Sequence, residues 1–316
     1  MSDIINIILP VFALIGLGYL SALSGILKMD VGDALAKFIF VIAIPALLVK
    51  TMATADFSGA SLWGFWATYF GGVAIVWLLA RIAVFNLLGR DRRAAVIAGV
   101  SAGFSNIVLI GIPLTERAYG EAGVAILLLL VAVHMPVMMT ASTLLMEQAV
   151  RADGVEKSPY NILKLFKNIA KNLLTNPIIL GILAGLVWRL STLPFNGIFA
   201  ETATAIGKTA GPLALFSVGM SLNKYGIKGN LFQGSLLAGL SLVVLPASIY
   251  LLANFVFHLP ADWARIAVIA AALPTGVNAY LFASHFKVAE GLATNTIILT
   301  ILASMVTLSF WLWIMS

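Results

Sequence analysis

The chain has 316 residues, of which 61% are hydrophobic and only 10% are charged, and its mean hydropathy is +1.04. A soluble domain usually carries about 25% charged residues, so this composition excludes a water-soluble globule, a disordered chain and a nucleic-acid-binding protein. The 19 basic residues and the net charge of +6 fit topology signals on the cytoplasmic loops of a membrane protein. The chain has no cysteine and only 3 histidines, far apart, so we expect no disulfide, no metal site and no cysteine nucleophile.

Charged residues, glycines and prolines divide the apolar sequence into ten predicted membrane-spanning helices, since a hydrocarbon core of ~30 Å needs roughly 20 helical residues. The first apolar run lacks the basic start of a signal peptide, because Asp3 is its only early charge, and we expect it to be retained. The predicted fold class is an all-α integral membrane protein. The expected helices are Ile4–Ser24, Gly32–Thr51, Ala60–Leu88, Ala94–Ala118, Glu121–Gln148, Asn176–Leu190, Ile198–Leu222, Leu231–Phe257, Trp263–Phe286 and Gly291–Ile314.

The basic residues indicate how these helices are oriented. They gather on the loops after the first, third, fifth, seventh and ninth helices, among them Arg90, Arg92, Arg93, Arg151, Lys157, Lys164, Lys167, Lys171, Lys224 and Lys228. The opposite loops hold only Lys50, Arg117, Arg189 and Arg265. The positive-inside rule then places both termini outside, in the periplasm if the membrane is the inner membrane of a bacterium, as we expect. The alternative is a miscounted helix, which moves one terminus to the other side.

Weak internal similarity predicts two five-helix repeats, residues 1–150 and 173–316, joined by a cytoplasmic linker at 151–172. Pro45 of the second helix and Pro212 of the seventh begin similar stretches, and Asn106 of the fourth corresponds to Asn278 of the ninth. An odd number of helices inverts the second repeat in the membrane, a plan common in secondary transporters. In the linker, residues 160–171 place apolar side chains on one face and lysines elsewhere, which predicts an amphipathic helix in the membrane interface.

The fourth and ninth helices are predicted to be interrupted, the fourth at Gly111 and Pro113 and the ninth at Pro274. Proline removes a backbone donor and glycine lowers the cost of unwinding. Unwound backbone at membrane depth is tolerated only where it is buried or lines a wet cavity. A helix that begins at such a break presents free N–H groups and a positive dipole end, which suit a carboxylate.

Asn106 and Asn278 add neutral amide donors beside these breaks. We therefore predict a substrate site that comprises Asn106, Asn278, Ser105, Thr275 and Gly276. The alternative is that the prolines only kink the helices and the asparagines bridge neighbouring helices.

Ionisable residues within membrane helices are candidates for binding or coupling. Lys208 in the seventh helix supplies positive potential to an anion, or else snorkels to the outer surface or pairs with Glu201. His134 in the fifth helix is a proton relay or a packing residue, and Glu116 marks the outer end of the fourth helix. Neither interrupted stretch contains Asp or Glu, which disfavours proton exchange through carboxylates there. Uniport, sodium coupling and proton coupling elsewhere stay open, and no cofactor is expected.

Several stretches in order carry a family resemblance: Leu9-Pro-Val-Phe12, Gly16-Leu-Gly-Tyr19, Ile44-Pro-Ala-Leu-Leu48, Phe104–Gly120, Asn176-Pro-Ile-Ile-Leu-Gly181, Gly211–Leu222 and Leu273-Pro-Thr-Gly-Val-Asn278. Through them, almost the whole chain resembles the auxin efflux carrier family of membrane transport proteins. The resemblance implies the fold of bile acid symporters and sodium/proton antiporters, in which the fourth and ninth helices cross at their breaks. It implies a scaffold of the first, second, sixth and seventh helices, often a homodimer interface, and a moving domain of the other helices.

The resemblance also implies a substrate class, because members of this family typically move small organic anions. The asparagines that bind the carboxylate of auxin in plant members map to Asn106 and Asn278. The short loop between the fifth and sixth helices differs from many plant members, which argues against loop regulation of the plant type. Auxin is not the expected substrate.

The sequence thus predicts a secondary transporter that moves a small carboxylate across the membrane by an elevator-like movement of Asn106 and Asn278 past the scaffold. The alternatives are a channel and a transporter-like receptor for small anions. An enzyme is not expected, because Ser105 in Gly-Phe-Ser-Asn matches no nucleophile motif. The identity of the substrate and the direction of transport are left open.

Overall fold

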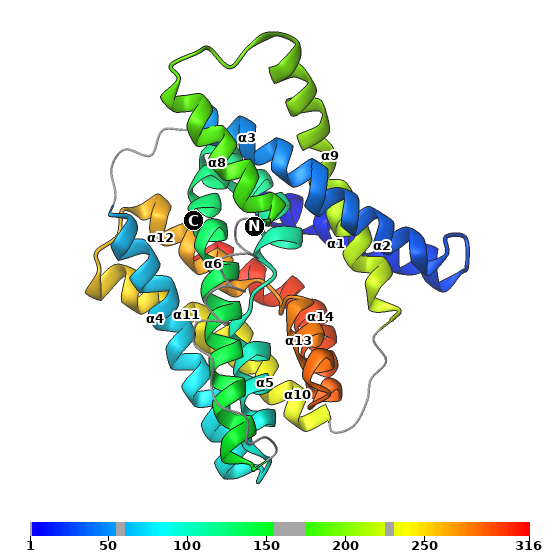
Figure 1. Ribbon diagram of the computed structural model, residues 1–316, viewed down its shortest axis with the longest axis vertical. Helices are drawn as coiled ribbons and strands as arrows, with labels where there is room; N and C mark the ends of the chain where they lie inside the picture. Colours follow the sequence, from blue (N-terminus) through cyan, green and yellow to red (C-terminus); the bar gives the residue numbers. More distant parts are fainter. Residues whose placement is uncertain (1, 55–60, 155–174, 225–230) are drawn as a thin grey trace.

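Helices make up every regular element of residues 2–54, 61–154, 175–224 and 231–316, the parts of the chain that the computed structural model describes (Figure 1). The α-helices are α1 (Ser2–Leu23), α2 (Met29–Phe38), α3 (Ile44–Thr54), α4 (Leu62–Arg81), α5 (Arg92–Gly103), α6 (Ile112–Ala152), α8 (Pro177–Leu190), α9 (Gly197–Leu222), α10 (Leu231–Gly239), α11 (Leu245–Leu251), α12 (Ala261–Ala272), α13 (Asn278–Phe286) and α14 (Glu290–Ile314). The π-helical segments are η1 (Ile39–Ala43), η2 (Ile82–Leu87), η3 (Ile107–Gly111), η4 (Leu240–Val244) and η5 (Leu252–Val256). The predicted amphipathic helix at 160–171 lies outside the described residues.

Polar side chains begin helices close to the predicted starts. Asp91 Oδ1 accepts a hydrogen bond from the backbone N–H of Ala94 at 2.7 Å at the start of α5. Asn176 Oδ1 accepts one from the N–H of Ile178 at 2.9 Å at the start of α8. Such caps satisfy N–H groups that the first helical turn leaves without a partner, which is why charged and amide residues marked these boundaries in the sequence.

Length and apolar composition identify which of these helical segments can cross a membrane. In the described part of the chain, six continuous segments qualify: Asp3–Leu23, Met29–Thr54, Leu62–Leu87, Ile107–Ala152, Leu231–Val256 and Glu290–Ile314. Pro177–Leu190 is a shorter apolar helix. The segment Ile107–Ala152 contains a kink at Gly120, whose φ of 64° and ψ of −163° are not helical, between the predicted fourth and fifth helices. The helices are those of an integral membrane protein, and the count of ten spans stays a prediction.

The first helix group consists of α1, α2, α3, α8 and α9, which pack on one another. Glycines allow α1 and α9 to touch backbone to backbone. A Cβ atom on Gly18 would lie 2.0 Å from the carbonyl oxygen of Phe216, and a Cβ atom on Gly219 would lie 1.9 Å from that of Ile15. Small residues at such crossings are how membrane helices gain close van der Waals packing.

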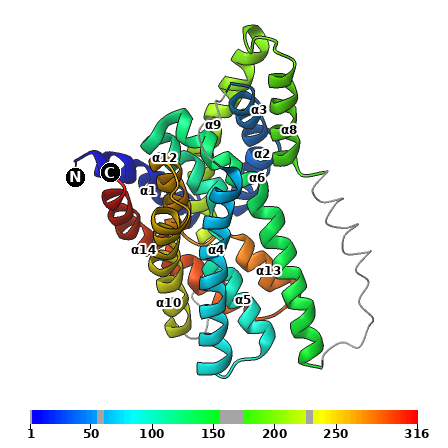
Figure 2. The same ribbon diagram turned by 90° about the vertical axis from the view of Figure 1, so that its left-hand side faces the viewer.

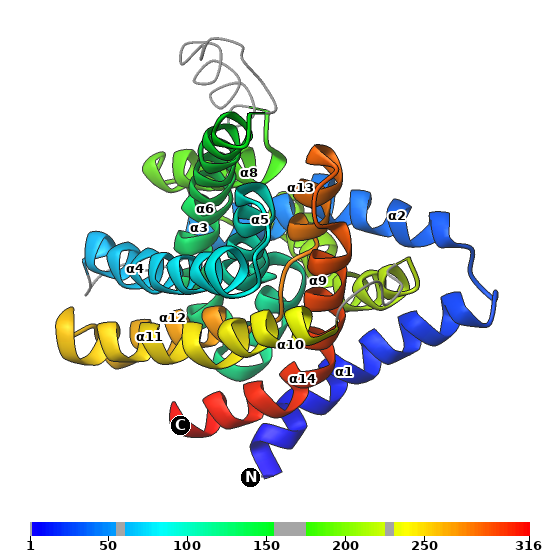
Figure 3. The same cartoon turned by 90° about the horizontal axis from the view of Figure 1, so that it is seen from below.

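The second helix group consists of α4, α5, α6 and α10–α14, in which α4 packs on α5 and α11, α10 on α14, and α12 on α11. In Figure 1 this group fills the lower part of the molecule, while α2, α3, α8 and α9 lie above and to the right. Figure 2 shows the long α6 running down one side. Figure 3 shows α1 and α14 side by side near both ends of the chain, in agreement with their direct contact. The two groups also meet along α6, which contacts α1, α3 and α9.

Candidate functional site

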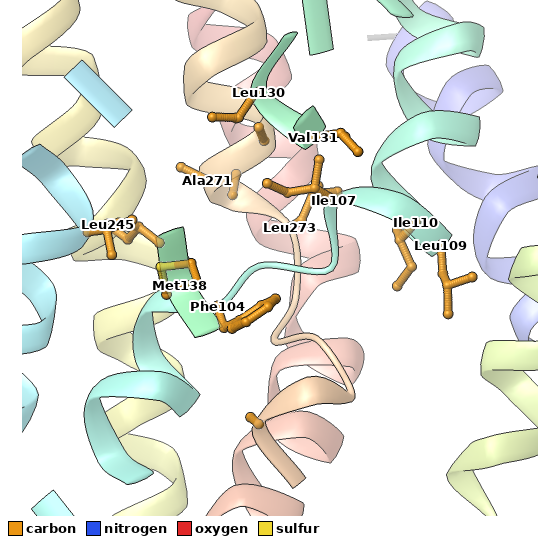
Figure 4. Close-up of a cluster of buried hydrophobic side chains, with 14 of the residues drawn as sticks. Phe104, Ile107, Leu109, Ile110, Leu130, Val131, Met138, Leu245, Ala271 and Leu273 are labelled. Carbon is orange, nitrogen blue, oxygen red and sulfur yellow. The ribbon is translucent and has the colours of Figure 1, made fainter. Parts of the chain in front are cut away.

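Two interruptions in helices of the second group meet at one point. Helix α5 ends at Gly103 and η3 begins at Ile107, while α12 ends at Ala272 and α13 begins at Asn278. The chain between these ends is not helical at Phe104 and Leu273, and the two backbone segments pass each other near these residues (Figure 4). The predicted interruption of each helix is therefore present in the structure.

A short antiparallel β-bridge between Ser105 and Thr275 joins the two interruptions. The N–H of Asn106 donates to the carbonyl oxygen of Pro274 at 2.8 Å, and the N–H of Gly276 donates to that of Phe104 at 2.7 Å. Backbone groups that unwinding would leave unsatisfied in a membrane thus satisfy one another.

Hydroxyl groups complete the junction of the two breaks. Thr275 Oγ1 donates to the carbonyl oxygen of Ser101 at 2.8 Å, in the last turn of α5. Ser105 Oγ donates to that of Ala271 at 3.4 Å, in the last turn of α12. The N–H of Thr275 also donates to Thr300 Oγ1 on α14 at 3.1 Å. The hydroxyls of Thr275 and Ser105 therefore each donate to a carbonyl at the helix end of the opposite chain segment, where carbonyls lack partners.

The predicted break residues occupy different positions. Pro274 lies within the interruption, as expected, and its carbonyl takes part in the bridge. Gly111 and Pro113 do not interrupt the fourth helix: Gly111 has helical φ and ψ of −64° and −47°, and Pro113 lies in the first turn of α6. Proline is tolerated there because its missing N–H is not needed at a helix start. The break lies earlier, at Phe104–Asn106.

Asn106 lies at the crossing, and only the oxygen of its side-chain amide makes a hydrogen bond with a described residue. Its Oδ1 accepts a hydrogen bond from the N–H of Leu109 at 3.3 Å and caps η3. The side chain is only 6% exposed, and its Nδ2 has no hydrogen-bond partner among the described residues. A buried donor without an acceptor costs about 1–3 kcal/mol, so this amide favours a ligand that accepts a hydrogen bond. Asn278, half-buried, is the first residue of α13.

A cavity of about 30 Å³ lies at the crossing, enough for about one water molecule. The helix starts of η3 and α13 both border it through Asn106 and Asn278. Helix N-termini attract anions through free N–H groups and the helix dipole. The residues that line the cavity are Phe40, Phe104, Ser105, Asn106, Ile107, Val108, Val131, His134, Met135, Pro136, Asn176, Ile178, Ile179, Gly276, Val277 and Asn278.

This lining brings together most of the predicted site. Ser105, Asn106, Gly276 and Asn278 border the cavity, whereas Thr275, fully buried, does not. Among the described residues, the lining holds no carboxylate and no fixed cation, so the amides and the helix ends supply its polarity.

His134 also borders the cavity, and its ring is packed among aromatic side chains. It makes edge contacts with Phe104, at 4.9 Å between ring centroids, and with Tyr69, at 5.6 Å. The side chain is 4% exposed, and its Nε2 has no hydrogen-bond partner in the described part of the chain.

Lys208 lies away from the crossing. It is exposed and lines a separate cavity with Lys50, Glu116 and Glu121, where Lys50 Nζ lies 2.6 Å from Glu121 Oε1. Within the described residues Lys208 makes no ion pair with Glu201. Lys208 therefore lies where α9, α3 and α6 meet, and not at the crossing.

Sequence reasoning missed Asn176 as a site residue. It precedes α8 in the first helix group, borders the same cavity as Asn106, and its Nδ2 lies 3.8 Å from Met135 Sδ. Phe40 of η1 reaches the cavity from the same group. An Asn-Pro pair at a helix start is a visible cap signal, but only packing brings it to the crossing. The cavity thus lies between the two helix groups.

The protein has apolar helices of membrane length and two interrupted helices that cross beside an amide-lined cavity. This architecture is that of membrane transport proteins. The family model described as "Membrane transport protein" matches residues 3–312. The chain therefore belongs to this family of membrane transporters, and the resemblance to auxin efflux carriers is confirmed.

Relatives match the chain from end to end. A "Putative malonate transporter" of Rhizobium meliloti is 27% identical over 317 residues, which cover 98% of this chain and 95% of the relative. An "Uncharacterized transporter" of Methanothermobacter thermautotrophicus is 24% identical, with 96% of each chain covered. The "Uncharacterized transporter YfdV" of Escherichia coli K12 is 22% identical, with 97% of this chain and 96% of the relative covered.

Proposed function

We propose that this membrane transporter is a secondary transporter that moves a small organic anion and binds its carboxylate at the helix crossing. The observation that carries the proposal is the buried Nδ2 of Asn106, which lacks an acceptor within the described residues. Asn278 and the starts of η3 and α13 lie around the same cavity. Neutral donors at this position hold an anion without the Born cost of burying a protein charge.

The proposed substrate class is a short carboxylate, with dicarboxylates as the first to test. The site offers two amides, Asn106 and Asn278, on two helix starts, which matches two carboxylates a few bonds apart. The name of the Rhizobium meliloti relative points to malonate. The small volume of the cavity, about 30 Å³, requires the helix groups to separate before a molecule of this size enters.

The proposed movement is an elevator-like displacement of the second helix group, as the transport domain, along the first group, as the scaffold. The cavity has one wall in each group, with Asn106 and Asn278 on one side and Asn176 and Phe40 on the other. The hydrogen bonds of the bridge hold the two breaks together. Moving them as one unit keeps the anion solvated by protein, whereas dismantling the site exposes its charge to hydrocarbon.

The proposed architecture has ten spans in two inverted five-helix repeats, residues 1–150 and 173–316, with both termini on the outer side of a bacterial inner membrane. The first helix group also forms a homodimer interface. Coupling to sodium or to a proton, with His134 as one candidate, and uniport are each compatible with this site.

Counterflow of labelled malonate, succinate and acetate in proteoliposomes tests the function. Losing a hydrogen bond to a charged group costs about 1.5–3 kcal/mol, so Asn106→Ala and Asn278→Ala are expected to weaken substrate affinity roughly 10- to 150-fold. Asn254→Ala is the matched control, because the amide of Asn254 donates to the carbonyl of Tyr250 within its own helical segment. Normal counterflow and affinity in both site variants would reject this site.

The same preparation separates the carrier from its alternatives. A carrier exchanges labelled for unlabelled anion with a saturable rate. A channel gives an ionic current far above that rate, and a receptor binds the anion without counterflow. Either of the last two results replaces the proposed function.

A further inference from the structure

A second cavity, of about 630 Å³, lies within the second helix group, apart from the helix crossing. It falls within the range of roughly 300–1,000 Å³ that is typical of ligand sites. One face of α4, the start of α5 and the second half of α6 form its walls. We call it the α4–α6 groove, and its lining residues are Phe70, Val73, Ala74, Trp77, Leu78, Arg81, Arg92, Ala95, Val96, Val137, Met138, Ala141, Leu145, Gln148, Ala149 and Ala152.

The sequence explains why this space is not filled by side chains. Alanines point into it from all three helices, among them Ala74 on α4, Ala95 on α5 and Ala141 on α6. At the edge of the groove, Leu78 is 56% exposed and Val137 is 42% exposed, so the groove opens to the surroundings of the protein. An apolar hollow of this kind is not a favourable place for water.

One end of the groove carries positive charge. Arg81, at the end of α4, is exposed and makes no hydrogen bond or ion pair with any described residue. Arg92 is held in place at the start of α5, because its Nη1 donates to the carbonyl oxygen of Ala152 at 2.9 Å. Its Cζ also lies 5.5 Å from the ring centroid of Phe85.

Carboxylates near this end of the groove neutralise little of the positive charge of Arg81 and Arg92. Asp153 Oδ1 lies 3.9 Å from Arg92 Nη1, while its Oδ2 lies 3.4 Å from Arg93 Nε. Asp91 also pairs with Arg93, at 2.9 Å. Both carboxylates thus pair mainly with Arg93. Among the described residues, Arg81 and Arg92 are the only charged ones that line the groove.

We propose that the α4–α6 groove binds an anionic phospholipid, with one acyl chain along its apolar walls and the phosphate between Arg81 and Arg92. A small dicarboxylate gains nothing from walls such as Val73, Trp77 and Leu145, whereas a hydrocarbon chain does. The arginines lie on the loop side that the positive-inside rule assigns to the cytoplasm, and basic pockets between membrane helices recognise lipid phosphates there. The membrane itself supplies this ligand.

Thermal unfolding of the purified, delipidated protein in detergent tests the site. Phosphatidylglycerol is expected to raise the melting temperature more than phosphatidylcholine with the same acyl chains, and glycerol 3-phosphate alone is expected to have no effect. Equal effects of the two lipids would overturn the proposal. Stabilisation by glycerol 3-phosphate alone would overturn it in favour of a site for free phosphate.

Variants locate the effect in the groove. Arg81→Gln removes a charge that holds no described contact, so it leaves the fold intact and is expected to weaken phosphatidylglycerol binding about tenfold or more, as for a lost charged hydrogen bond. Ala141→Phe fills the groove and is expected to abolish the difference between the lipids. Arg90→Gln is the matched control, because Arg90 is an exposed arginine in the loop before α5 and does not line the groove. An equal loss in Arg90→Gln, or none in Arg81→Gln and Ala141→Phe, would contradict the site.

Discussion

At the residue scale, neighbouring polar side chains at the crossing differ in whether their donors have hydrogen-bond acceptors. The hydroxyl of Thr275 is occupied by the carbonyl of Ser101, while the Nδ2 of Asn106 has no partner among the described residues. Thr275→Val keeps the shape of the side chain and leaves that buried carbonyl unsatisfied, so we expect it to destabilise the protein by about 1–3 kcal/mol. Substrate affinity is expected to stay unchanged. Thermal unfolding in detergent and substrate binding measure the two effects separately.

Thr209→Val is the control for this substitution, because Thr209 Oγ1 donates only to the carbonyl of Ile206 in its own helix and is exposed. We expect little change in its stability. If Thr275→Val instead weakens substrate binding as strongly as Asn106→Ala, then Thr275 contacts the substrate and its role at the junction is secondary.

At the element scale, the contact between α1 and α9 depends on glycine. A Cβ atom on Gly18 would lie 2.0 Å from the carbonyl oxygen of Phe216, whereas a Cβ atom on Gly16 would meet nothing within 4 Å. Gly18→Ala must push the helices apart and is expected to destabilise the protein by about 1–3 kcal/mol. Gly16→Ala, two residues away in α1, is expected to stabilise it by roughly 0.5–1 kcal/mol. Melting temperatures of the two variants check the pair, and equal shifts would refute this account of the interface.

At the scale of the whole molecule, the proposed elevator movement must separate contacts between the two helix groups. Lys50 on α3 and Glu121 on α6 form an ion pair at 2.6 Å across this boundary. In the pair Lys50→Cys and Glu121→Cys, a short reducible crosslinker is expected to reduce transport to background, and a reductant is expected to restore it. The native chain has no cysteine, so the reagent meets only the introduced thiols.

The matched control for the crosslink is Asp262→Cys with Arg265→Cys, whose native side chains pair within α12 at 3.1 Å. A crosslink inside one helix is expected to leave transport unchanged. Undiminished transport with Lys50→Cys and Glu121→Cys fully crosslinked would show that these parts do not move apart during the cycle.

The orientation of the whole molecule is also testable because the chain is free of cysteine. Arginines and lysines on alternate loops predict that both termini lie outside. Ser316→Cys, at the exposed C-terminus, is expected to react with a membrane-impermeant thiol reagent added outside intact cells, and Arg90→Cys only after the membrane is opened. The reverse labelling pattern would invert the topology.

The sequence predicted much of the fold, because the signals for helices and for their interruptions lie in short stretches of neighbouring residues. Apolar runs marked helices that are long enough for a membrane, and Gly, Pro and Asn close together, with a Ser or a Thr, marked both interrupted helices. The position of the first break was misjudged, since Pro113 is accommodated in the first turn of a helix while the chain unwinds at Phe104–Asn106. The roles of the amides and the arginines in binding stay predictions.

The sequence by itself determined that this protein is a helical membrane protein, through its apolar composition and the spacing of its charges. So many apolar side chains are stable in contact with lipid and not in contact with water. Only the tertiary structure decided which polar groups of the described residues have hydrogen-bond partners and which have none. The acceptor for Thr275 lies 174 positions away, Asn176 reaches the crossing from another helix group, and alanines of three helices leave the α4–α6 groove open. Hydrogen bonds and cavities of this kind depend on distances between segments far apart in the chain, which no local pattern of residues encodes.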